Sequence, residues 1–163
     1  MQGKFIRGGF TLALFVALAT GAATAQDQSA ATAKDVIFAR KILMDTIGKN
    51  MDALEGFFES DKLEPSEVRE HSENISVMLM SFPHLFPPAS NQWKEGAERD
   101  PGLDTFASPD VWKNFSDFYK RADAASKTAF KAGRVQDEAG ARALGAELRA
   151  QCDGCHGAYM MKD

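Results

Sequence analysis

The sequence lacks several features that mark other protein classes, such as an excess of Cys, Pro or Gly and a long apolar run. The chain of 163 residues has two Cys, two Trp and two Tyr, and its six Pro and 13 Gly match ordinary usage. No apolar run reaches the roughly 18 residues that a membrane-spanning helix needs. These absences argue against a collagen, a disordered chain and an integral membrane protein. With 44% apolar and 26% charged residues, the chain suits one globular domain with a single core.

The first 25 residues are typical of a secretory signal peptide. Lys4 and Arg7 form a basic start, residues 10–19 are mostly apolar, and residues 23–25 supply small side chains for a peptidase. A retained membrane anchor is the alternative, but ten helical residues span only about 15 Å, half of a bilayer core. We therefore predict cleavage after Ala25, with residues 26–163 as the mature domain.

Basic residues are fewer than acidic residues, and cleavage of the predicted signal peptide would remove two more of them. The whole chain carries 19 basic and 23 acidic side chains, a net charge of −4, and loss of Lys4 and Arg7 takes the mature chain to −6. Such a chain lacks the basic surface that nucleic-acid binding requires. It is suited to partner proteins with basic patches.

Helical periodicity appears in four segments, and no segment alternates as a strand does. We predict helices at about 34–59, from Pro65 to before Pro83, from an N-cap at Ser108 to Ala132, and at about 137–161. Short links join the first pair and the last pair, so each pair is antiparallel. The fold class predicted is all-α: an up-down-up-down antiparallel four-helix bundle, with a long crossover over residues 82–108 between helices two and three.

The sequence Cys152-Asp153-Gly154-Cys155-His156 contains Cys-x-x-Cys-His, the attachment motif of c-type haem. On a helix, residues at positions i, i+3 and i+4 share one face, so both thiols and the imidazole project together. The thiols can bond to the haem vinyl groups while His156 reaches the iron. We predict one haem c, with its iron, covalently attached to Cys152 and Cys155.

Three other interpretations of the motif compete with haem attachment. A disulfide between Cys152 and Cys155 would be strained on a regular helix and would close a very short loop. A thioredoxin-like pair would lie at a helix N-terminus in an α/β fold, whereas this pair ends the last helix of an all-α chain. Zinc would need two more ligands, and only His71 and His84 remain as nitrogen donors.

A haem motif at the C-terminal end of an exported four-helix chain resembles the class II cytochromes c, which include cytochrome c′. The segments 43–51 and 82–87 are similar to the low-spin cytochrome c-556 type. In that group a first-helix Met binds the iron opposite the His, and Met44 occupies the matching position. The resemblance therefore implies His156 and Met44 as iron ligands. The family often has a basic residue shortly after the haem His, where this chain has Met160 and Met161.

The position of Met44 can also be considered without the resemblance. Met44 lies roughly 15 Å from the start of the first helix and His156 roughly 9 Å from the end of the last, at the same end of the bundle. Met78, roughly 6 Å from the end of helix two, is the competing ligand. A methionine on the apolar face of a helix can also simply pack in the core. The residues alone therefore do not decide which side chain, if any, is the sixth ligand of the iron.

Arg40 falls one turn before Met44 on the apolar face of its helix. A buried guanidinium needs an anion or an escape to solvent, and a haem propionate is such an anion. Because the family commonly places an Arg here, we predict that Arg40 pairs with a propionate. Aromatic and aliphatic side chains on helices two and three are expected to wall the haem: Leu79, Phe82, Trp112, Phe115 and Tyr119.

The function predicted is a periplasmic one-electron carrier with His/Met axial ligation, because such ligands hold the iron in both oxidation states. The alternative is a five-coordinate, cytochrome c′-like protein that binds nitric oxide or carbon monoxide. No residue pattern points to bond-making or bond-breaking catalysis, so we predict that the chain is not an enzyme. The expected partners are redox proteins, with no nucleic acid and no membrane span after signal cleavage, and a homodimer is compatible with the sequence.

Overall fold

The computed structural model describes residues 21–60, 64–94 and 105–161, with side chains from residue 33 onward. Within those ranges the chain is helical, and the sole pairing of β type is an isolated bridge between Ala107 and Met160. The elements, in chain order, are α1 (Gly21–Glu59), α2 (Pro65–Ser81), the 3₁₀ turns η1 (Phe82–Leu85) and η2 (Pro88–Ser90), α3 (Asp110–Lys113), α4 (Phe115–Ala132) and α5 (Glu138–Tyr159).

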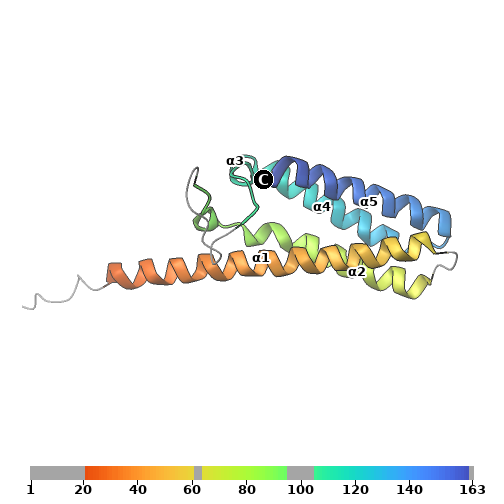
Figure 1. Ribbon diagram of the computed structural model, residues 1–163, viewed down its shortest axis with the longest axis horizontal. Helices are drawn as coiled ribbons and strands as arrows, with labels where there is room; N and C mark the ends of the chain where they lie inside the picture. The colour runs from red at the N-terminus through yellow and green to blue at the C-terminus, as the bar shows by residue number, and fades with distance from the viewer. Residues whose placement is uncertain (1–20, 61–63, 95–104, 162–163) are drawn as a thin grey trace, which may run out of the picture.

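Figure 1 shows the antiparallel pair α1 and α2 packed along the antiparallel pair α4 and α5. The predicted four-helix bundle is confirmed. The N-terminal part of α1 extends past the other helices, because this helix begins at Gly21 rather than near residue 34 as the periodicity predicted. Residues 1–20 of the predicted signal peptide lie outside the described part of the chain, so its cleavage stays a prediction.

The third predicted helix differs from expectation in two ways. It is divided at Asn114, whose φ of −120° and ψ of 38° leave the helical region, so α3 and α4 are separate elements. The predicted side-chain cap at Ser108 is wrong: its buried hydroxyl has no hydrogen-bond partner, and its carbonyl accepts from Val111 N at 3.1 Å. The division also leaves Phe115, predicted to point inward, 39% exposed.

The apolar stripes of the helices form two adjoining clusters. The central cluster of the bundle comprises Ile47, Met51, Leu54, Val68, Ile75, Leu79, Ala125, Ala129 and Leu148. The aromatic cluster lies toward the crossover and comprises Phe82, Phe86, Val111, Phe118 and Tyr159. Leu43 and Met44 pack against both clusters, so the middle of α1 lies where the two meet.

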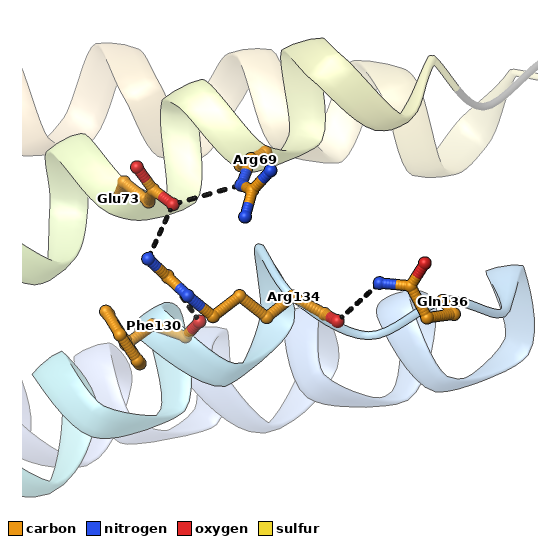
Figure 2. A network of polar contacts seen from close by, with 5 residues as sticks. All are labelled: Arg69, Glu73, Phe130, Arg134 and Gln136. Carbon is orange, nitrogen blue, oxygen red and sulfur yellow. Dashed lines mark hydrogen bonds and ion pairs between the residues drawn. The ribbon is translucent and has the colours of Figure 1, made fainter.

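A polar network ties the connection between α4 and α5 to α2 (Figure 2). Glu73 forms ion pairs with Arg134 at 2.9 Å and with Arg69 at 3.2 Å. The Arg134 guanidinium also lies 3.5 Å from the centre of the Phe130 ring. This network belongs to the end of the bundle where α2 and α5 begin, so the Cys-x-x-Cys-His segment, at the end of α5, lies at the opposite end.

Candidate functional site

The Cys-x-x-Cys-His segment forms the last turns of α5. This helix begins where Asp137 accepts a hydrogen bond from Gly140 N at 2.7 Å, and it ends at Tyr159. Cys152 packs against the central cluster and Cys155 against the aromatic cluster, and both thiols are free and half-buried. Burial raises the pKa of each thiol. The two sulfurs are therefore neutral thiols on the wall of the core.

Two neighbouring cavities lie beside this segment, with volumes of about 360 Å³ and about 120 Å³. The larger lies within the range of ligand sites in proteins, roughly 300–1,000 Å³. Five residues line both cavities: Met44, Phe82, Phe118, Cys155 and His156. Cys152 lines the smaller cavity and Arg40 the larger. The structure thus brings together the five site residues predicted from the sequence: Arg40, Met44, Cys152, Cys155 and His156.

The competing ligands lie elsewhere. Met78 is half-buried against the central cluster and lines neither cavity, whereas Met44 lines both. The Nδ1 atom of His71 lies 2.9 Å from Asn50 Oδ1, and its ring packs near Phe57. His156 is an exposed residue whose side chain still borders both cavities. Among the candidates, Met44 and His156 are the pair that share a cavity.

Arg40 is a buried cation whose hydrogen-bond acceptors in the described part of the chain are uncharged. It is 3% exposed, and its Nη1 atom donates to Ser90 Oγ at 3.1 Å and its Nη2 atom to the Ser90 carbonyl at 3.4 Å. Its Nε atom has no hydrogen-bond partner, and no carboxylate of the described chain forms an ion pair with it. The guanidinium lies 4.4 Å from the centre of the Phe86 ring, and burial lowers the pKa of Arg40 to about 10. An unpaired buried charge of this kind favours a negatively charged ligand in the larger cavity.

The predicted walls of the site are partly right. Leu79 and Phe82 line the smaller cavity, as expected. Trp112, Phe115 and Tyr119 line neither cavity. Trp112 instead holds the crossover, because its Nε1 atom donates to the Phe86 carbonyl at 3.1 Å.

Sequence reasoning missed several residues that line the cavities or contact Arg40, on the crossover and on α4 and α5. Ser90 and Phe86, which contact Arg40, lie in and beside short 3₁₀ turns that hydrophobic periodicity does not reveal. Arg121 on α4 and Arg149 on α5 both line the smaller cavity. Arg121 pairs with Asp117 four positions away, as many surface arginines do, and Arg149 pairs with Glu55 on another helix. Nothing in the sequence pattern therefore predicts that these two arginines lie at the cavity.

The end of α5 and the residues up to Met161 close one side of the larger cavity. Met161 N donates to the Phe106 carbonyl at 2.7 Å, and Ser108 N donates to the Tyr159 carbonyl at 2.8 Å. These bonds pair the end of α5 with the end of the crossover. The residues 105–107 and Met160 thereby become part of the cavity wall.

The arrangement fits a haem c. Two free thiols and an imidazole meet at an apolar cavity, a thioether lines the same space from α1, and a buried guanidinium whose Nε atom has no hydrogen-bond partner among the described residues is available for a carboxylate. These are the groups that would form two thioether bonds, bind iron and neutralise a propionate.

Comparison with known proteins agrees with this chemistry. The sequence pattern of the cytochrome c′ family matches residues 35–160. A cytochrome c-556 from Agrobacterium tumefaciens (strain II Chrys) is 32% identical over 126 residues, which are 76% of this chain and 94% of that protein. The chain belongs to the cytochrome c′ family.

Solved structures of cytochromes c′ and c-556 share the fold. The cytochrome c′ of Thermochromatium tepidum superposes with a TM-score of 0.68 at 19% identity, covering 80% of this chain and 97% of that one. The cytochrome c556 of R. palustris gives a TM-score of 0.65 at 21% identity, covering 79% and 98%. The resemblance to class II cytochromes c is confirmed, and covalently attached haem c is the cofactor of this cytochrome c′ family member.

Proposed function

We propose that the protein is a periplasmic one-electron carrier with one haem c and with His156 and Met44 as axial ligands. The observation that supports this most directly is that Met44 on α1 and His156 on α5 line the same two cavities, whereas Met78 lines neither. A side chain on each side of the cofactor would leave no open position on the iron. Such a site transfers electrons without exchanging ligands.

Each remaining group has a defined task in this proposal. Cys152 and Cys155 would form the two thioether bonds, one from each side of the boundary between the core clusters. Arg40 would pair with a propionate from its buried place beside Ser90. When bound, haem c supplies reversible one-electron transfer at its iron. The thioether of Met44 and the apolar aromatic cluster would both raise the reduction potential, because each disfavours the extra positive charge of oxidised iron.

The periplasmic location and the partners are part of the same proposal. Residues 1–25 have the features of a secretory signal peptide, and no helix in the described ranges is long and apolar enough to span a bilayer. The mature net charge of −6 suits redox partners with basic patches. One cytochrome c′ of known structure is described as having ligand-controlled dimer dissociation, and a homodimer of this chain stays a prediction.

The absorption spectrum of the purified holoprotein tests the proposal. A low-spin spectrum in both oxidation states supports the carrier. A high-spin spectrum with rapid binding of carbon monoxide would instead support a five-coordinate, gas-binding protein, and absence of a Soret band would exclude both.

A further inference from the structure

Another cation, Arg121, borders the proposed haem site at the cavity that Arg40 does not line. Arg121 lies on α4 and lines the smaller cavity together with Cys152, Cys155 and His156, whereas Arg40 lines the larger. Its Nη1 atom is 3.9 Å from the position that a Cβ on Gly154 would occupy. The guanidinium therefore lies beside the turn of α5 that carries the attachment motif.

Two hydrogen bonds to one carboxylate hold this guanidinium in place. Asp117 Oδ2 accepts from Arg121 Nε at 2.7 Å and from the Tyr159 hydroxyl at 2.6 Å. Tyr159 is a buried residue three positions after His156, so its hydroxyl ties the end of α5 to α4. The hydrogen bonds from Tyr159 and Arg121 lower the pKa of Asp117, which keeps it a carboxylate at neutral pH.

The charges of this network do not cancel at the cavity, because Arg121 lines it and Asp117 does not. Arg149, the other cation at the smaller cavity, is more fully neutralised. It binds both carboxylate oxygens of Glu55, at 2.5 and 2.7 Å, and lies 3.8 Å from Asp52. Arg121 is thus the cation at this cavity whose field is least compensated.

We propose that Arg121 raises the reduction potential of the bound haem, and that Asp117 and Tyr159 are the positioning residues that hold its guanidinium beside Cys155 and His156. A fixed positive charge near the iron opposes the added charge of the oxidised state. This inference rests on the proposed function, because it requires the iron to lie at these cavities.

The same helix provides a matched control. Lys127 and Asp123 form an ion pair at 2.6 Å with the same spacing of four residues as Arg121 and Asp117. Neither Lys127 nor Asp123 lines either cavity. Lys127→Gln therefore removes one positive charge from α4 and breaks one exposed ion pair, as Arg121→Gln does, but away from the site.

The experiment is a redox titration of the holoprotein and of the variants R121Q, R121K and K127Q at low and high salt. At a fixed ambient potential, R121Q should shift the ratio of oxidised to reduced protein by roughly threefold to tenfold toward the oxidised form. R121K should keep most of the wild-type potential, and K127Q should differ from it by less than about twofold, with high salt reducing any difference.

Equal potentials for R121Q and K127Q would overturn the proposal, as would an R121K variant that shifts as far as R121Q. An R121Q protein that fails to retain haem while K127Q retains it would assign Arg121 to holding the turn, and would also overturn it. These outcomes are separate from failure of the carrier function, which would appear as a high-spin or haem-free spectrum of the wild-type protein.

Discussion

Met44 on α1 and His156 on α5 border the same two cavities, although they lie far apart in the sequence. The up-down-up-down order brings them together, because α1 enters the bundle at the end where α5 finishes. The boundary between the central and aromatic clusters passes through Met44. The proposed haem site therefore lies at the junction of two parts of one core.

Covalent attachment is tested by removing one thiol at a time. Cys152→Ala and Cys155→Ala should each leave at most one thioether bond and lower the yield of holoprotein, because each half-buried sulfur supplies one of the two bonds. Mass spectrometry after acid-acetone extraction measures what remains attached. Asp153→Ala, which alters an exposed spacer residue, is the control and should retain the haem. A wild-type mass equal to that of the bare polypeptide would contradict the attachment.

Pairing of Arg40 with a propionate predicts a change in potential. Arg40→Leu should lower the reduction potential by some tens of millivolts, since a charge about 8 Å away at an effective dielectric of 20 interacts by about 2 kcal/mol before screening. Potentiometric titration measures the shift. Arg69→Leu, on the exposed part of α2 at the other end of the bundle, should leave the potential unchanged. Equal potentials for the two variants would show that Arg40 does not act on the haem.

Two glycines on different helices should respond oppositely to alanine. A Cβ added at the buried Gly145 of α5 would lie 2.1 Å from the Phe58 ring, so Gly145→Ala should destabilise the protein by about 1–3 kcal/mol through overpacking. Gly56 of α1 is exposed, with nothing within 4 Å of an added Cβ, so Gly56→Ala should stabilise the protein by about 0.5–1 kcal/mol through helix propensity. Urea unfolding measures both. Stabilisation by Gly145→Ala would mean that α1 and α5 are not packed this closely.

Hydrophobic periodicity, together with Pro and Gly residues near the helix ends, predicted most of the fold. Pro65 begins α2 and Pro83 follows its end, because proline fits the first turn of a helix but has no N–H for a hydrogen bond further along it. Gly133, a poor helix former, follows α4. The attachment motif predicted Cys152, Cys155 and His156 from local spacing alone. These features depend on neighbours in sequence, which is why they could be found without the structure.

Other features depend on contacts between distant segments. Val111 and Phe118 are both buried, on either side of the division at Asn114. The hydrophobic periodicity of the sequence therefore continues through Asn114 and predicts one helix where the structure has two. Ser90 reaches Arg40 only because the crossover folds back over α1, and Trp112 points to that crossover rather than to the cavity. Arg121 and Lys127 have the same local pattern, and only the packing of α4 against α5 distinguishes them.

The axial role of Met44 is tested most directly by near-infrared absorption of the oxidised holoprotein and its Met variants. A sulfur bound to low-spin iron gives a weak charge-transfer band, which Met44→Ala should abolish while allowing the reduced protein to bind carbon monoxide. Met78→Ala, at a half-buried residue outside both cavities, should keep the band and lower stability by about 2–5 kcal/mol at most. Loss of the band in Met78→Ala with its retention in Met44→Ala, or a wild type that lacks the band, would contradict the account.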